Sequence, residues 1–191
     1  DLNIRHLPII ADSKYAGLIS REDLENEDES IKISALDHKF LIVSLLPDMH
    51  FLEALKKIRH FEVSLLPVIN KAGELLGVVT AEKLLYTAAI FNNTDEPGGL
   101  IVFQTDKRNF SFGEISRLIE TNDASITQLN TYTEADTGFL IVTIRINTIE
   151  ISDIIATLQR YDYHIRYYFG EENYENELKE NYDMLMNYLS I

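Results

Sequence analysis

A short apolar segment with a proline at the same place occurs twice in this chain, at residues 4–10 and again at residues 63–69. A second pair of matching segments follows in the same order, at residues 17–24 and 77–84, after turns that differ in length by one residue. Two pairs of matched segments in one order indicate an internal repeat. We therefore predict that residues 1–91 contain two copies of one structural unit.

The elements of this unit follow from the periodicity of apolar residues in the second copy. A helix is predicted from near Asp48, then strands at 63–69 and 75–79, then a helix that Thr80 caps and that ends near Phe91. With a strand before the first helix, the unit is strand, helix, strand, strand, helix.

The first copy lacks the opening strand and helix of this unit. Only three residues precede its matched strand, and projection of the second copy by the repeat offset implies that about 20 residues are absent. Half a unit seldom folds alone, because its apolar strands would be uncovered. Since the first residue is Asp1 rather than methionine, we expect the natural chain to start earlier.

The order of these features resembles the CBS motif. In that motif a Pro-containing apolar strand and a turn lead to Gly-h-h-Ser/Thr-x-x-Asp, where h is apolar, at the start of a helix. The resemblance implies that the two copies pack as a pseudo-twofold pair, a Bateman module, over residues 1–91. It also implies an adenosine-type ligand such as AMP, ADP, ATP or S-adenosylmethionine.

Ser20 and Thr80 stand at the starts of the two helices that carry this motif. Helix starts attract phosphate, because their N–H groups are unpaired and carry partial positive charge. Asp23 could accept bonds from both ribose hydroxyls, which is the role that the resemblance gives to the corresponding aspartate. Ser20-x-x-Asp23 is also a capping box that needs no ligand, and both interpretations stay open.

The second copy departs from the motif at Lys83, which stands where the acid is expected. A lysine cannot accept hydrogen bonds from ribose hydroxyls, although it could contact a phosphate. We therefore expect asymmetric sites, with the Ser20/Asp23 site favoured and the Thr80 site degenerate or empty.

Arg5 and His6 belong to the strand that lines such clefts in the family, and as donors they could contact phosphate. The alternative is an exposed cation and an ordinary strand histidine. With Ser20, Asp23, Thr80 and Lys83, they complete the candidate nucleotide-binding set.

A second domain is predicted at residues 99–170, after a polar and turn-rich linker at residues 92–98. Ser111 and Glu114 form a capping box at the start of its first helix. The order of elements is βαββαβ, a ferredoxin-like plan. Strands are expected at 100–105, 126–133, 139–146 and 164–169. The fold class is thus mixed α+β and α/β.

This second domain, placed after a CBS pair, looks like an ACT domain, and the whole chain is similar to CBS–ACT proteins of the acetoin-utilization type. The resemblance places an amino-acid site in the loop after the first strand, where Asp106 could contact an ammonium group and Arg108 a carboxylate, beside Asn109. The loop has no glycine before Gly113, so its backbone can approach a ligand less closely than a glycine-containing loop could. Charged loop residues are more often simply solvated.

Residues 171–191 are strongly acidic, yet their apolar residues follow helical spacing. We expect an amphipathic helix that packs on its own subunit or on a partner, and a chain that forms a homodimer. The apolar residues are Leu178, Tyr182, Leu185, Met186 and Leu189.

The composition restricts the classes of function. A formal net charge of −14 would repel nucleic acids, and no basic stripe offsets it. The acidic runs are interpreted as solvated surface, with partner binding as the alternative. The absence of cysteine excludes disulfides and thiolate metal sites. No apolar stretch is long enough for a membrane span and no signal pattern is present, so we expect a cytoplasmic protein that binds no membrane.

Enzymatic sites are not indicated. The five histidines are scattered without i,i+4 pairs, and phosphate-loop and dinucleotide patterns are lacking. We expect no catalytic residue, metal or cofactor. The leading hypothesis is a regulatory protein in which an adenosine-type nucleotide, with an amino acid at the ACT domain, controls an unidentified partner. The alternative is a ligand-free dimerisation or scaffold protein with vestigial sites.

Overall fold

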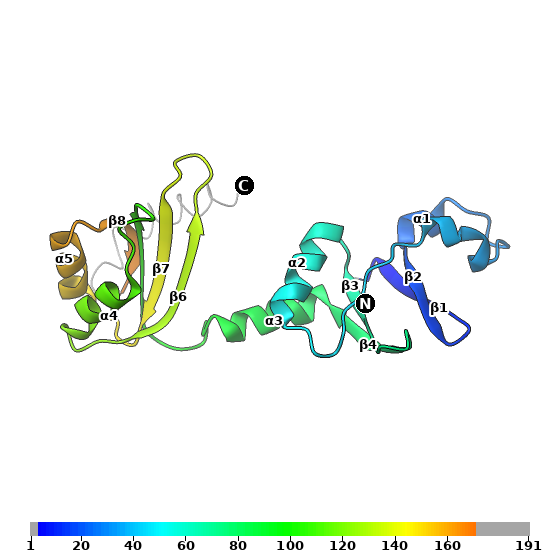
Figure 1. The fold of residues 1–191 in the computed structure, drawn as a ribbon, viewed down its shortest axis with the longest axis horizontal. Helices are drawn as coiled ribbons and strands as arrows, with labels where there is room; N and C mark the ends of the chain where they lie inside the picture. The colour runs from blue at the N-terminus through cyan, green and yellow to red at the C-terminus, as the bar shows by residue number, and fades with distance from the viewer. Residues whose placement is uncertain (1–3, 171–191) are drawn as a thin grey trace. The chain divides into compact units, whose positions relative to one another are not determined.

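The computed structural model describes residues 4–170 and has mixed α and β structure (Figure 1). The chain divides into two compact units, Asp1–Phe91 and Asn92–Ile191, and each is described here by itself. The predicted helix at residues 171–191 lies outside the described residues.

The first copy of the repeat is a hairpin followed by short helices. Strand β1 (His6–Ala11) pairs antiparallel with β2 (Lys14–Ser20), and the two turn residues between them both have positive φ, as a tight hairpin turn requires. β2 runs directly into α1 (Arg21–Glu25), and a 3₁₀ helix, η1 (Ile33–Lys39), follows. The helix η1 was not predicted from the sequence.

The second copy shows the predicted order of helices and strands. It contains α2 (Phe51–Phe61), β3 (Leu65–Ile69), β4 (Leu75–Thr80) and α3 (Ala81–Phe91). The predicted start of α2 near Asp48 was wrong by three residues, because His50 has an extended backbone and its Nδ1 accepts from the Leu52 N–H at 3.3 Å. The opening strand is reduced to Leu45, which pairs in parallel with Val68 of β3.

The two hairpins have the same register. Pro8 lies opposite Leu18 in the first hairpin, and Pro67 lies opposite Val78 in the second. In both hairpins the pairing register shifts by one residue just beyond the residue that follows the proline. The shift lies between Ile9 and Ile10 in β1 and between Val68 and Ile69 in β3. The repeat in the sequence is therefore a repeat of backbone geometry, including its β-bulge.

Both copies contribute to one apolar core in the first unit. The buried residues come from β2, the segment before α2, α2 itself, the segment between α2 and β3, β3 and α3. They are Leu18, Val43, Leu45, Ala54, Val63, Leu65, Leu66 and Leu84. Ile4 packs against this core from the start of the first copy. Because the core is shared, the two copies are held side by side and a cleft can form where they meet.

The second unit is a four-stranded antiparallel sheet in the order β6-β7-β5-β8. Its strands are β5 (Gly99–Thr105), β6 (Ile126–Thr133), β7 (Leu140–Ile146) and β8 (His164–Phe169). Helices α4 (Phe112–Glu120) and α5 (Ser152–Arg160) follow β5 and β7. This order and pairing confirm the predicted ferredoxin-like plan.

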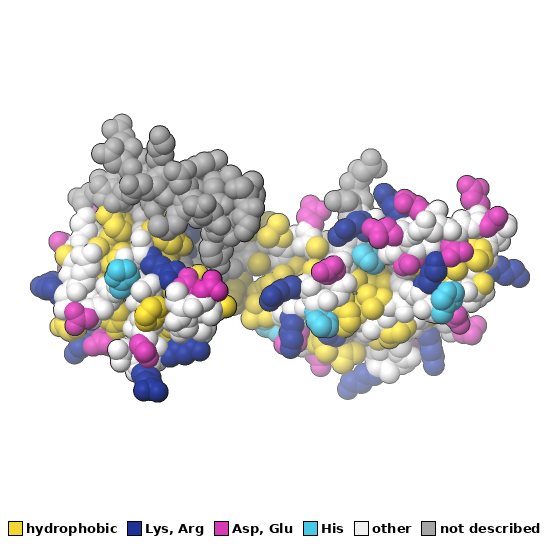
Figure 2. Space-filling view, turned by 90° about the horizontal axis from the view of Figure 1, so that it is seen from above, with side chains coloured by type: hydrophobic (Ala, Val, Ile, Leu, Met, Phe, Trp, Pro, Cys, Tyr) yellow, Lys and Arg dark blue, Asp and Glu magenta, His cyan; other side chains and the backbone are white. Residues whose placement is uncertain are grey.

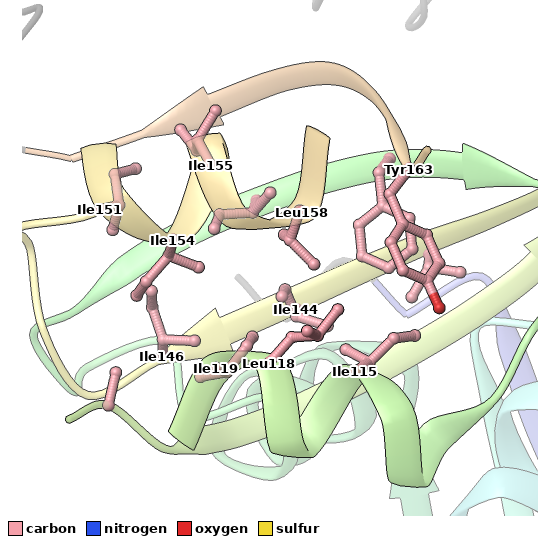
Figure 3. Close-up of a cluster of buried hydrophobic side chains, with 14 residues drawn as sticks. Ile115, Leu118, Ile119, Ile144, Ile146, Ile151, Ile154, Ile155, Leu158 and Tyr163 are labelled. Atoms are coloured by element: carbon pink, nitrogen blue, oxygen red, sulfur yellow. The ribbon is translucent and has the colours of Figure 1, made fainter. Parts of the chain in front are cut away.

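The helices α4 and α5 pack their apolar faces with one face of this sheet, and the side chains between them point toward one another (Figure 3). Ile115 and Ile119 of α4, Leu158 of α5 and Ile144 of β7 are each fully buried. Aliphatic residues at helical spacing on two helices and at every second strand position account for this core.

Only half of the predicted capping box at α4 forms. The Ser111 hydroxyl accepts from the Glu114 N–H at 3.3 Å. The Glu114 carboxylate instead accepts from the Tyr163 hydroxyl at 2.7 Å. The Glu114 carboxylate, which the local pattern assigns to the cap, thus bonds to Tyr163, a residue distant in the sequence.

Candidate functional site

A cleft of about 650 Å³ lies in the first unit where the two copies meet. Its walls come from the segment before β1, the end of α2, the segment between α2 and β3, the end of β4 and the start of α3. The lining residues are Ile4, Arg5, Ile58, Arg59, Glu62, Val63, Ser64, Thr80, Ala81 and Glu82. The cleft therefore lies at the Thr80 end of the unit, which the sequence analysis expected to be degenerate or empty.

The cleft has both cationic and anionic groups on its walls. Arg5 comes from the first copy and Arg59 from the last turn of α2, and both side chains are exposed to solvent. Glu62 and Glu82 add two exposed carboxylates. A guanidinium donates bidentate hydrogen bonds to phosphate oxygens, whereas a carboxylate accepts from hydroxyls.

The start of α3 forms one wall of the cleft. The Ala81 N–H donates to the Ser64 carbonyl at 3.0 Å. The Lys83 N–H donates to the Thr80 hydroxyl oxygen at 3.1 Å. Thr80 therefore caps α3 as predicted, and the partial positive charge of this 11-residue helix faces the cleft at its lining residues Thr80, Ala81 and Glu82.

Ser64 joins the two copies at the back of the cleft. Its hydroxyl oxygen accepts from the backbone N–H of Arg5 at 3.0 Å and from that of His6 at 3.2 Å. Its own N–H donates to His6 Nδ1 at 3.1 Å. Burial, followed by the nearby Arg5 charge, holds the pKa of His6 below its ordinary value. We name these contacts the His6–Ser64 clasp.

The Ser20 and Asp23 side chains bond to each other at the start of α1. The Asp23 N–H donates to Ser20 Oγ at 3.0 Å, while the Ser20 hydroxyl and N–H donate to Asp23 Oδ2 at 2.5 and 3.3 Å. These bonds, the Ser20 hydroxyl first, hold the pKa of Asp23 below its ordinary value. The capping box is thus formed, and neither residue lines the cleft of about 650 Å³.

Only some of the other predicted nucleotide-binding residues line the cleft. Arg5 and Thr80 line the cleft, whereas His6 lies behind it in the clasp. The Lys83 ammonium lies 4.7 Å from the centre of the Tyr86 ring, at a distance that suits a cation–π contact.

The predicted amino-acid loop in the second unit is closed by its own hydrogen bonds. The Arg108 N–H donates to Asp106 Oδ1 at 2.8 Å, and the Asn109 N–H donates to the Asp106 carbonyl at 2.9 Å. All three residues are exposed. The structure thus places the three candidate residues in one turn.

Sequence reasoning missed several cleft residues, among them Arg59, Ser64 and Glu82. A signal for Ser64 was present, because the repeat alignment pairs it with Arg5. Arg59 carries no such signal, since a cation in the last turn of an amphipathic helix is ordinary. Its position in the cleft follows from how the end of α2 meets the start of α3.

A match to a known protein family lies within the first unit. Residues 42–89 match the CBS domain family. The matched segment runs from the residues before α2, where Leu45 pairs with β3, to the last turn of α3. It contains most of the cleft wall, including Arg59, Ser64 and Thr80.

Individual relatives share only part of their length with this chain. A homoserine O-acetyltransferase from Methanococcus vannielii is 32% identical over 95 residues, which cover 46% of this chain and 19% of that protein. The chain therefore spans about a fifth of the length of this curated relative.

Two solved structures also resemble the chain over less than half of its length. The cytosolic domain of the Mg²⁺ channel MgtE in complex with ATP is 20% identical with a TM-score of 0.40, over 44% of this chain and 34% of that chain. A CBS domain pair/ACT domain protein from Thermotoga maritima is 17% identical with a TM-score of 0.41, over 46% of this chain and 72% of that chain.

Within residues 4–170, no group of three or more histidine, aspartate or glutamate side chains could hold a metal ion. No helix in the described part of the chain is long and apolar enough to cross a bilayer.

Proposed function

We propose that this chain is a regulatory protein that binds an adenosine-type nucleotide in the cleft of its first unit. One observation carries the proposal: Arg5, Arg59 and the start of α3 surround a single hollow of about 650 Å³. Phosphate is attracted both by guanidinium groups and by a helix N-terminus. The hollow is within the size range of small-ligand sites.

The wall residues divide into three roles. Arg5 and Arg59 contact the phosphates, beside the start of α3. Glu62 or Glu82 accepts from the ribose hydroxyls, which Lys83 cannot do. The apolar wall, which includes Ile4, Ile58 and Val63, packs against the base. This assignment moves the favoured site from the Ser20/Asp23 end to the Thr80 end, because the Ser20 and Asp23 groups already bond to each other.

A regulatory role is supported by the fact that both copies of the repeat contribute residues to the cleft wall. The first copy supplies Ile4 and Arg5, and the second supplies the remaining lining residues. A ligand that contacts both copies favours one arrangement of the two, and such a preference is required for any shift in conformation.

Calorimetric titration with AMP, ADP, ATP and S-adenosylmethionine tests the proposal. We expect at least one nucleotide to bind with a millimolar or lower dissociation constant, and Arg59→Ala to weaken that binding by about tenfold or more, since charge-assisted bonds are the strong ones. Lys56→Ala removes an exposed cation from the same helix and is the matched control. If no nucleotide binds, or if both variants weaken it equally, the proposal fails.

A ligand-free dimerisation or scaffold protein is the second candidate. Hydrophobic side chains gather at the surface over α2 and α3 (Figure 2). Five residues of these helices, and Met49 just before α2, are between 41% and 71% exposed; the five are Leu52, Leu85, Tyr86, Ile90 and Phe91. Apolar surface of this kind favours a protein partner, and we propose a second copy of the chain.

The proposal also includes an amino-acid site at the ACT-like loop. Asp106 already accepts two backbone N–H bonds within its own turn, which leaves fewer groups for a ligand. Arg108 could still contact a carboxylate. Titration with free amino acids would test this loop separately from the cleft.

A further inference from the structure

We propose that His6 is a positioning residue for the cleft and makes the affinity of the cleft for its ligand depend on pH. His6 acts through Ser64, which lines the cleft and holds both copies of the repeat. The proposal rests on the nucleotide function inferred above, and its test is designed to fail separately from that function.

The first step is the protonation state that the clasp requires. The Ser64 N–H donates to His6 Nδ1 at 3.1 Å, so this ring nitrogen must carry a lone pair. The Ser64 hydroxyl lies 3.2 Å from the same nitrogen. A proton on Nδ1 would place one donor against another. The bond from the Ser64 N–H to the ring therefore exists only while the His6 ring is neutral, whereas the two backbone bonds to the Ser64 hydroxyl do not depend on the charge of the ring.

The second step is the set of charges around the ring. Arg5, on the same strand segment, disfavours the imidazolium form, whereas Asp23 and Glu22 of α1 favour it. Burial is the largest effect, and it lowers the pKa of His6 below the ordinary 6.5. The neutral ring therefore predominates at pH 7, and the charged form gains population as the solution becomes more acidic.

The third step is how the clasp reaches the cleft. The Ser64 carbonyl accepts from the Ala81 N–H at 3.0 Å, at the start of α3. The Arg5 carbonyl accepts from the Arg21 N–H at 2.7 Å, at the start of α1. Loss of the bond to His6 Nδ1 removes one of the four bonds that hold Ser64, whose bonds to the Arg5, His6 and Ala81 N–H groups remain. Ser64 is then held less firmly, and the groups that bind phosphate at Arg5 and at the start of α3 are placed less precisely.

Nucleotide titrations at about pH 7.5 and about pH 5 test this proposal. In the wild type we expect the affinity to fall by about three- to tenfold on acidification, the size of one hydrogen bond. His6→Gln keeps a side-chain acceptor that does not titrate, so it should lose most of this pH dependence. His6→Leu, which copies Leu65 at the matching repeat position, should bind weakly at both pH values. His38→Gln, at an exposed histidine of the same unit, is the control.

An NMR titration of the ligand-free protein separates this proposal from the nucleotide function. We expect the amide resonances of Ser64 and Ala81 to shift with the same apparent pKa as the His6 ring. If those amides do not follow the ring, or if His6→Gln retains the wild-type pH dependence, the role of His6 is refuted. If no nucleotide binds at either pH while the amides follow the ring, the nucleotide function is refuted and the proton-linked movement of Ser64 stands.

Discussion

Ser20 and Thr80 occupy the same position in the two copies, but their helices begin differently. Ser20 accepts from the Asp23 N–H, and the Asp23 carboxylate bonds back to Ser20. Thr80 accepts from the Lys83 N–H, and lysine has no acceptor with which to return the bond. Because Asp23 in the first copy corresponds to Lys83 in the second, α1 begins with a complete capping box, whereas α3 begins with a cap from the threonine alone.

This difference predicts a pH-dependent effect of Ser20→Ala on stability. We expect a loss of about 1 kcal/mol at neutral pH, the usual size for an N-cap. Because the folded pKa of Asp23 is lowered, its contribution is present above the unfolded value of 3.8 and is lost as the pH falls through the folded pKa.

Urea titrations of Ser20→Ala and the wild type at neutral and acidic pH measure this loss. We expect the difference in unfolding free energy to shrink as the pH falls below 3.8. Thr80→Ala has no carboxylate in its cap and should show the same loss at both pH values. An equal pH dependence in both variants would contradict the assignment.

Residue patterns predicted the caps but not the contacts that join the two copies. Ser20 and Thr80 were predictable because a cap depends on neighbours within a few residues. The bonds between Ser64 and His6 join residues 58 apart, so local pattern cannot reveal them. For the same reason Arg59 and Glu82 were not recognised as cleft residues.

The hairpin offers a comparison at the level of secondary-structure elements, since Leu7 and Leu66 occupy the same place in the repeat. Leu66 is fully buried, whereas Leu7 is 54% exposed. We expect Leu66→Ala to cost about 2–5 kcal/mol, and Leu7→Ala to cost less than about 1 kcal/mol. Chemical denaturation of the two variants measures both values. Equal losses would show that the two copies are covered alike in solution.

We expect a glycine-to-alanine substitution to have opposite effects on stability at two positions of the second unit. Gly98 has a φ of 156°, and a Cβ there would lie 2.0 Å from the Ile146 carbonyl oxygen. Gly98→Ala should therefore destabilise this unit by about 1–3 kcal/mol or more. Gly113 lies in α4 with open space around it, so Gly113→Ala should stabilise by about 0.5–1 kcal/mol. Thermal unfolding of both variants tests these signs.

Most elements were predictable from period and turn residues, and the exceptions have tertiary causes. The order βαββαβ of the second unit follows from alternation in its strands and helical spacing in α4 and α5. The helix η1 was missed because it depends on Leu36, which is 1% exposed and lacks a repeating apolar pattern around it. Its burial comes from packing, not from local preference.

At the scale of the whole molecule, exposed apolar surface on α3 predicts self-association. Leu85 is 71% exposed and Tyr86 is 59% exposed. We expect the wild type to be a dimer by light scattering, and Leu85→Glu to shift it toward monomer, because a charge opposes burial of this surface. Lys71→Glu adds the same acid in an exposed turn and should leave the mass unchanged. A monomeric wild type would refute dimerisation through this face.

The two hairpins differ in length only beyond their shared bulge, in the turn that joins the strands. Between the bulge and the start of the following helix, a shift of the strand pairing by one residue would exchange inward-facing and outward-facing side chains. In the turn beyond the bulge, the second hairpin has one more residue than the first. The Gly73 carbonyl in this longer turn accepts from the Tyr15 N–H at 2.8 Å. The hairpin turns are therefore where the two copies differ in length, and neither turn contributes a residue to the lining of the cleft.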